Sequence, residues 1–148
     1  KTINTNNSGI TITAWDVDIT GVGANGGNVN AGSGNINIYG AVAAQTIGLG
    51  LALKSMQLTA TELQFMTTTS GLRIGAEQSG SLSVNRVAAA ETDALTPIVS
   101  LYAKSDDSQI FFDNIAHSTF NAVYVNADNG ILVKAKFNTD TGSMLLEA

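Results

Sequence analysis

The sequence predicts an all-β fold, namely a parallel β-helix (β-solenoid) of about seven stacked rungs. Within short runs of the chain, apolar residues alternate with polar ones, which is the period of a β-strand that buries one face. Between runs, apolar residues recur at spacings of about 19 to 21 residues, so that successive rungs would align them in columns. The pairs at these spacings are Ile10 and Val29, Val17 and Ile36, Leu53 and Leu72, Leu63 and Leu82, Leu82 and Leu101, Ile110 and Ile131, and Val123 and Met144.

An antiparallel β-sandwich is the alternative fold, because its short strands also alternate and recur every ~8 to 12 residues. The β-helix is favoured for two reasons. Its apolar positions match at the offset of a whole rung, and Asn and Gly stand where stacked corners need residues that accept turn conformations.

The composition predicts one folded domain over residues 1–148, since 44% of the residues are hydrophobic and 13% are charged. The net charge of -5 disfavours binding to nucleic acid or to anionic lipid. The chain has no cysteine, so the core itself must supply the stability. A repetitive fold does not need disulfides, which leaves an extracellular location open. The low-charge stretches are too polar for a transmembrane helix, and no membrane span is predicted.

The first predicted strands lie before residue 41. Residues 10–14 alternate strictly and indicate a half-buried strand. Residues 15–20 alternate in the opposite phase, which predicts a corner near Ala14 and a strand on which Asp16 and Asp18 face water. Residues 34–40 alternate again and predict the next strand.

Short strands are predicted to continue from residue 47 to the end of the sequence. The glycines between the apolar residues of the first of these runs oppose a helix there. The inward-facing residues are expected to be Ile47, Leu49, Leu51, Leu53, Met56, Leu58, Leu63, Phe65, Leu72, Ile74, Leu82, Val84, Val99, Leu101, Ile110, Phe112, Val123, Val125, Ile131, Val133, Ala135, Phe137, Met144 and Leu146.

Residues 85–97 interrupt this rhythm and are interpreted as an insertion or loop. Their alanine-rich centre favours a short helix or a protrusion before Pro97, the single proline of the chain. A bulge at a corner and a protrusion that binds a partner both remain open, because loops on rigid scaffolds often carry binding residues.

Trp15, Asp16 and Asp18 are the candidate ligand-binding residues. Two carboxylates on one strand face would lie about 6 to 7 Å apart, a spacing that a sugar-cleaving pair could use, and an indole beside them could stack on a sugar. A solvated strand face carries such pairs equally well, and nothing in the sequence would raise the pKa of either carboxyl group.

No catalytic, metal-binding or cofactor-binding residues are predicted. His117 is the single histidine, and it stands in a polar stretch without the neighbours that nucleophilic catalysis requires. Residues 138–142 resemble the start of a calcium loop, but a glutamate at the required downstream position is missing. The expectation is therefore a protein that is not an enzyme and has no cofactor.

The runs at residues 9–14 and 34–40 resemble the repeats of filamentous-haemagglutinin-type exoproteins. The likeness consists of glycine followed by alternating isoleucines, and it extends over residues 1 to 84. Proteins of that family form right-handed parallel β-helices. The resemblance therefore implies a right-handed coil and a secreted or surface-exposed fibrous adhesin, with no catalytic residues to carry over.

The leading hypothesis is a structural or adhesive β-solenoid segment of a secreted or cell-surface fibrous protein. Its expected partners are further copies, joined end to end into a filament by self-assembly, and a glycan or host-surface ligand. The alternative is a carbohydrate-binding or carbohydrate-cleaving β-helix, such as a phage tail-fibre module. An ice-binding solenoid is less favoured, because Asn30 and Gly32 stand 19 residues beyond Thr11 and Thr13 and interrupt a threonine array.

Overall fold

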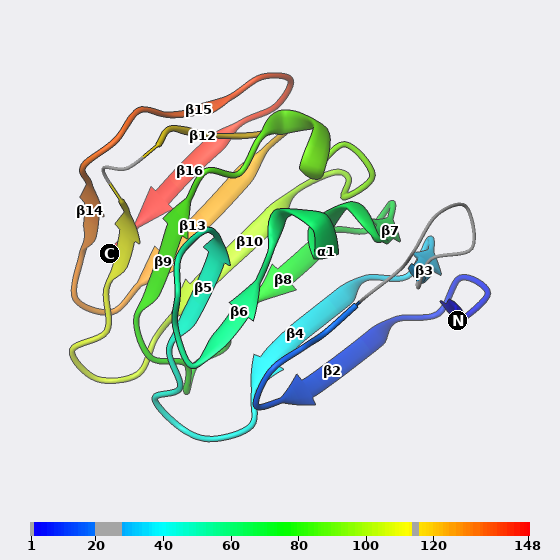
Figure 1. Cartoon of the computed structure of the whole chain (residues 1–148), viewed down its shortest axis with the longest axis horizontal. Coiled ribbons are helices and arrows are strands. Elements are labelled where there is room, and N and C mark those ends of the chain that lie inside the picture. Colours follow the sequence, from blue (N-terminus) through cyan, green and yellow to red (C-terminus); the bar gives the residue numbers. More distant parts are fainter. Residues whose placement is uncertain (1, 20–27, 114–115) are drawn as a thin grey trace.

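A computed structural model of the chain describes residues 2–19, 28–113 and 116–148, and these residues form an all-β structure (Figure 1). Sheet B has six strands, in the order β16 (Met144–Glu147), β13 (Val123–Ala127), β10 (Val99–Ala103), β8 (Leu72–Ile74), β4 (Ile36–Gly40) and β2 (Ile10–Ala14). Sheet C has five, in the order β14 (Ile131–Val133), β11 (Ile110–Phe112), β9 (Leu82–Asn85), β5 (Ile47–Gly50) and β6 (Met56–Leu58).

Two smaller sheets and two short helices complete the described part of the chain. Sheet A contains β1 (Thr2–Asn4), β3 (Asn28–Gly32) and β7 (Met66–Thr68), and sheet D contains β12 (Ser118–Phe120) and β15 (Phe137–Thr139). The helices are α1 (Ala60–Gln64) and the 3₁₀ helix η2 (Ala89–Glu91).

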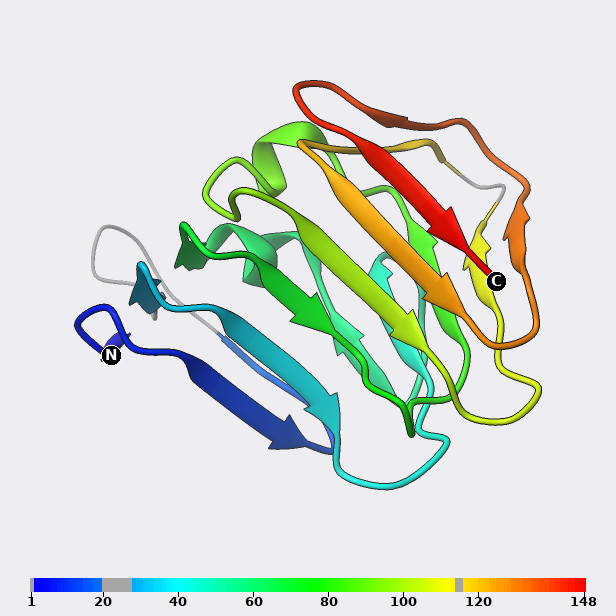
Figure 2. The same cartoon turned by 180° about the vertical axis from the view of Figure 1, so that it is seen from behind.

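Every strand pairing among the described residues is parallel, so the antiparallel sandwich is wrong. The chain passes repeatedly from sheet A or D to sheet B and then to sheet C, as in β3, β4 and β5 and again in β12, β13 and β14. Parallel neighbours in one sheet need such long connections, and here the other sheets supply them. Figure 2 shows the strands of sheet B side by side from the opposite direction.

The core consists of columns of apolar side chains that run across the strands. In sheet B one column passes through Ile10, Ile36, Leu72, Val99, Val123 and Met144, and another through Ile12, Ile38, Ile74, Leu101, Val125 and Leu146. In sheet C a column passes through Ile47, Leu82, Ile110 and Ile131. Most of these side chains are buried, and burial of this kind is the main stabilising contribution to the fold.

The spacing of the columns differs from the predicted 19 to 21 residues over most of the chain. The two late pairs, Ile110 with Ile131 and Val123 with Met144, are confirmed. The five earlier pairs are wrong: Ile10, for example, lies opposite Ile36 and not Val29. The corners vary in length, so the offset between partners varies as well, and sheet B has six strands where about seven rungs were expected.

Helix α1 replaces one predicted strand, at Leu63 and Phe65. Thr59 caps the helix with its side chain, and the Glu62 carboxylate accepts hydrogen bonds from the Thr59 backbone N–H at 2.7 Å and from the Thr59 hydroxyl at 2.8 Å. This capping box satisfies backbone donors that a helix start leaves free, which favours a helical turn over a strand. Leu63 is nevertheless buried, as expected of an inward residue.

Two further strand predictions are wrong. Residues 15–19 form no strand, although Val17 points into the core with 8% of its surface exposed. Leu51 and Leu53 were expected to face inward but are 51% and 79% exposed, because β5 ends at Gly50 and the chain turns there. Gly50 has a φ of 68°, and a Cβ at this position would lie 2.1 Å from the Asn85 carbonyl oxygen, so the turn requires glycine.

Residues 85–97 run along the wall that sheets A and D form. Leu95 makes a parallel bridge to Thr68 of β7, and the Thr119 backbone N–H of β12 donates to the Val87 carbonyl at 2.7 Å. Val87 and Leu95 are both buried. The segment therefore contributes side chains to the core between β7 and β12, with η2 at its centre.

The two ends of the strand stack differ. At the N-terminal end, residues 15–19 lie along the free edge of β6: Asp16 Oδ1 accepts from the Gln57 backbone N–H at 2.9 Å, and the Ile19 backbone N–H donates to Glu62 Oε1 at 3.1 Å. At the C-terminal end, no strand of the described residues pairs with the outer edges of β14 and β16, and apolar side chains of these strands are exposed. They are Leu132, Val133, Met144, Leu145 and Leu146, with exposed fractions between 37% and 52%.

Candidate functional site

The outward face of sheet B carries a group of aromatic and charged side chains that we call the tyrosine–arginine strip. Its residues on β4, β8, β10 and β13 alternate with core residues, as Arg73 does between Leu72 and Ile74, so the strand period directs them to solvent. The strip consists of Tyr39, Arg73, Tyr102, Tyr124, Asn126 and Glu147.

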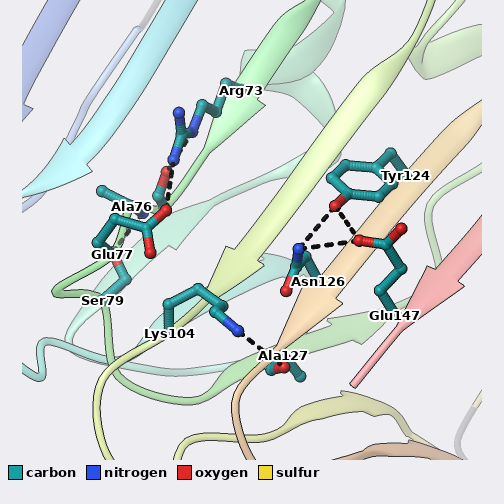
Figure 3. Close-up of polar contacts among 10 residues, drawn as sticks. Arg73, Ala76, Glu77, Ser79, Lys104, Tyr124, Asn126, Ala127 and Glu147 are labelled. Atoms are coloured by element: carbon teal, nitrogen blue, oxygen red, sulfur yellow. Dashed lines mark hydrogen bonds and ion pairs between the residues drawn. The ribbon is translucent and has the colours of Figure 1, made fainter.

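Arg73 lies on β8, between the strands that carry Tyr39 and Tyr102, and Figure 3 shows its side chain beside the turn that carries Glu77. Its Cζ lies 3.8 Å from the centroid of the Tyr102 ring and 5.9 Å from that of Tyr39. Its Nη2 lies 3.5 Å from Glu77 Oε1, and its Nε donates to the Gly75 carbonyl at 3.3 Å. Cation–π contacts at exposed sites contribute only about 0.5 to 1 kcal/mol each, and together these contacts favour one position of the guanidinium.

The turn after β8 brings the partners of Arg73 into place. Gly75 has a φ of 82°, and a Cβ there would lie 2.0 Å from the Tyr102 carbonyl oxygen, so the turn can lie against β10 only with glycine. Ser79 Oγ accepts from the Ala76 backbone N–H at 2.9 Å and closes the loop that carries Glu77. The close approach to Tyr102 and the hydrogen bond within the loop together give the loop a defined shape beside the strip.

Tyr124, Asn126 and Glu147 form a second polar cluster on the strip (Figure 3). The Tyr124 ring meets the Tyr102 ring edge to face, with centroids 5.5 Å apart. The Tyr124 hydroxyl donates to the Glu147 carboxylate, and Asn126 Nδ2 donates to the Tyr124 hydroxyl at 2.6 Å and to Glu147 Oε2 at 3.2 Å. The hydrogen bond to Glu147 is the main reason why the pKa of the Tyr124 phenol is raised above its usual value.

A hollow of about 470 Å³ adjoins the strip at the corner between sheets B and C. Its volume lies within the range of small-molecule sites, although it is open to solvent. Side chains that can donate or accept hydrogen bonds line it together with one aromatic ring. They are Thr13, Tyr39, Arg73, Glu77, Gln78 and Ser79.

The predicted ligand residues Trp15, Asp16 and Asp18 lie elsewhere, in the segment over the edge of β6. Trp15 is 60% exposed, and its backbone carbonyl accepts a hydrogen bond from the Gln45 side chain. Asp16 binds the backbone of Gln57, which gives it a role in covering β6. The two carboxylates do not share a strand face, because this segment is not a strand. Ligand binding by these three residues stays a prediction.

The sequence did not reveal the tyrosine–arginine strip as a site. Tyrosines at outward positions of alternating runs were the available signal, but only the observed register brings Arg73 beside Tyr39 and Tyr102. His117 lies outside the strip, exposed just before β12.

Comparisons with protein-family models, with curated protein sequences and with solved structures found no match for this chain. Among residues 2–19, 28–113 and 116–148, no group of three or more His, Cys, Asp or Glu side chains is placed to hold a metal ion. In the same residues no helix has the length and apolar character needed to cross a membrane. The function of the tyrosine–arginine strip is therefore inferred from the arrangement of its side chains.

Proposed function

We propose that this chain is a non-enzymatic adhesive module whose tyrosine–arginine strip binds a glycan. In this proposal the chain forms a closed, right-handed β-solenoid and belongs to a secreted or cell-surface fibrous protein. The repeated passage through sheets A or D, B and C supports the coil, and the strong preference of parallel crossovers for the right hand supports its handedness. The resemblance to filamentous-haemagglutinin-type repeats supports the adhesive role.

The observation that carries the proposal is the arrangement of the strip on a rigid parallel sheet. A sugar ring has apolar C–H faces and a rim of hydroxyls. A site that binds it therefore combines aromatic rings, which contact the C–H faces, with polar groups that hydrogen-bond to the hydroxyls. Tyr39 offers a ring at the hollow, and Arg73 offers a guanidinium that is already fixed by Tyr102 and Glu77. A site that is ordered before binding loses little entropy when the ligand arrives.

The spacing of the strip also suits an extended ligand. Neighbouring strands lie ~4.8 Å apart, and the strip crosses from β4 to β16 over the width of sheet B. The positive charge of Arg73 is balanced by Glu77, so the hollow is close to neutral. These features favour a neutral oligosaccharide that lies across the strands over a compact anionic ligand.

Glycan-array binding with single-residue variants tests this proposal. We expect the purified chain to bind a set of neutral glycans and Tyr102→Ala to weaken binding about two- to fivefold, because the Arg73 guanidinium loses a cation–π contact of about 0.5 to 1 kcal/mol. Phe111→Ala is the matched control, since Phe111 is a partly exposed aromatic residue on the outward side of sheet C with Lys134 beside its ring. Absence of glycan binding by the unaltered chain, or equal binding by the two variants, would contradict the proposal.

A further inference from the structure

We propose that Tyr102 and Tyr124 form a site of oxidative cross-linking, at which a one-electron oxidant couples their rings into a dityrosine bond between β10 and β13. The proposal does not depend on glycan binding, although both residues belong to the tyrosine–arginine strip. It rests on the contact between the two rings, on a carboxylate that accepts the proton of one phenol, and on the position of the third tyrosine of the chain.

Tyr102 and Tyr124 are neighbours on the outward face of sheet B. Their strands pair directly, and Tyr102 lies opposite Asn126, two positions after Tyr124 along β13. The ring centroids are 5.5 Å apart, the ring planes meet at 69°, and both side chains are partly exposed. Coupling joins ring carbons beside the two phenol oxygens, so it requires rings in contact that an oxidant in solvent can reach. This pair meets both requirements, and its proximity makes the coupling step intramolecular.

The Tyr124 phenol has a proton acceptor within hydrogen-bond distance. Its hydroxyl donates to the Glu147 carboxylate and accepts from Asn126 Nδ2 at 2.6 Å (Figure 3). Removal of an electron from a phenol makes its O–H group strongly acidic, so the proton leaves together with the electron. A base that already contacts the hydroxyl receives this proton directly. Tyr124 is therefore the phenol on which the first radical forms.

The position of Tyr39, the third tyrosine of the chain, makes the cross-link selective. Tyr39 lies on β4, and β8 separates this strand from β10. Arg73 of β8 contacts both rings, with its Cζ 3.8 Å from the centroid of Tyr102 and 5.9 Å from that of Tyr39. The guanidinium therefore stands beside Tyr102 on the side of Tyr39, whereas β13 brings Tyr124 to Tyr102 from the other neighbouring strand. A single internal product is expected.

The reaction removes two hydrogen atoms from the chain. Two one-electron oxidations take an electron and the phenol proton from each tyrosine, and the proton passes to Glu147 from Tyr124 and to solvent from Tyr102. The two radicals form one carbon–carbon bond between ring positions beside the oxygens, and the hydrogens at these carbons move to the oxygens and restore both phenols. A haem peroxidase with hydrogen peroxide accepts the two electrons, and the peroxide leaves as two molecules of water.

The bond would constrain a chain that has no cysteine and hence no disulfide. It would close a loop from residue 102 to residue 124 in the unfolded state and lower the conformational entropy of that state, as a disulfide does. We expect the melting temperature of the cross-linked chain to rise by about 5 to 10 °C. Thermal unfolding before and after oxidation measures this rise, and an unchanged melting temperature would contradict the constraint.

Peroxidase treatment of tyrosine variants tests the site. With a haem peroxidase and hydrogen peroxide, we expect the dilute chain to gain dityrosine fluorescence, to lose the mass of two hydrogen atoms and to remain a monomer on a denaturing gel. Peptide mapping should find the link between Tyr102 and Tyr124. Tyr102→Phe and Tyr124→Phe should each lose this product, and Tyr39→Phe is the matched control that should keep it. Methionine oxidation adds oxygen, so mass distinguishes it from coupling.

Three results would overturn the proposal. The first is oxidation of the unaltered chain without any dityrosine. The second is a link that contains Tyr39. The third is formation of covalent oligomers in place of the internal link, because the two rings of one chain would then not be each other's coupling partners.

Glu147→Gln tests the proton acceptor separately from the ring contact. The variant removes the base and leaves both tyrosines in place, so dityrosine fluorescence should grow about tenfold more slowly. This is less than a positioned base usually contributes, because water also accepts the proton at this exposed site. Added acetate should raise the rate in the variant and leave the rate of the unaltered chain unchanged. Equal rates without acetate would show that Glu147 does not accept the proton, since a merely structural role gives no response to an added base.

Discussion

Apolar side chains are buried at the N-terminal end of the strand stack and exposed at its C-terminal end. At the N-terminal end residues 15–19 cross the edge of β6, and Val17 is buried. At the C-terminal end the last strands leave Leu145 and Leu146 about half exposed. The covered end depends on a few polar contacts that hold one segment in place, whereas the open end depends on contacts with the preceding strand alone. The edge strand of a parallel sheet is therefore covered only where an additional segment of the chain packs against it.

The largest effect should come from placing a charge at each end. We expect Val17→Asp to lower the free energy of unfolding by about 3 kcal/mol or more, because the carboxylate would enter the core without a partner. Leu146→Asp should cost less than about 1 kcal/mol, since that side chain already contacts water. Urea unfolding at concentrations where sedimentation finds monomers measures both. Equal losses at the two ends would show that the ends do not differ in stability.

The next effect concerns Glu62, the residue that anchors the covering segment. Glu62→Ala should lower the free energy of unfolding by about 2 kcal/mol, because it removes the capping box of α1 and leaves the Ile19 backbone N–H without an acceptor. Hydrogen exchange should accelerate at Ile19 and Thr59 and stay unchanged in β13. Glu62→Gln, which keeps one acceptor oxygen, is the matched control and should lose less. Uniform acceleration over the whole chain would contradict a local role.

A smaller effect is expected at Asp16, which binds the edge of β6. Asp16→Ala should cost about 0.5 to 1 kcal/mol, the lower end of the range for one hydrogen bond, because this bond is exposed to solvent. Asp18→Ala removes a neighbouring carboxylate for which the described residues show no hydrogen bond, and it should change monomer stability little. Chemical unfolding of the two variants side by side separates the hydrogen bond from the general loss of negative charge.

The smallest effect is expected at the open end, in the titration of Tyr124. Its hydrogen bond to Glu147 of the last strand raises its pKa, so Glu147→Gln should lower the pKa of Tyr124 toward the usual value of about 10. Because the folded-state pKa lies above the unfolded one, the bond stabilises the fold below the unfolded pKa, and this contribution disappears as the pH rises through the folded pKa. Ultraviolet difference spectra against pH measure the shift. Tyr39→Phe serves as a control that removes a different phenol.

The fold class could be predicted from the sequence because strand alternation is a local property. Runs such as residues 10–14 and 36–40 alternate in the sequence and form β2 and β4. The offset between rungs was predictable only in the C-terminal part. It is 21 residues from Val123 to Met144 but 36 residues from Ile36 to Leu72, where β6 and α1 lie between the paired strands. Connections of variable length leave no fixed period to detect.

Other features required knowledge of the three-dimensional register. Helix α1 had a local signature, since Thr59 and Glu62 stand at the spacing of a capping box, but the alternation of Leu63 and Phe65 favoured a strand. The tyrosine–arginine strip had no local signature. Arg73 and Tyr102 belong to different runs, and their contact depends on which residues of β8 and β10 lie opposite one another.

The pairing of each strand with only its immediate neighbours has a mechanical consequence. Among the described residues β16 pairs with β13 and with no further strand, so tension applied along the stack through β16 is resisted by that pairing and by the packing of Met144 and Leu146, and the hydrogen bonds are loaded in sequence as β16 peels away. The next strand carries load only after the first has detached. Resistance to pulling is therefore set by one strand at a time, and rupture should proceed as a series of small, similar steps from the uncovered edge inward.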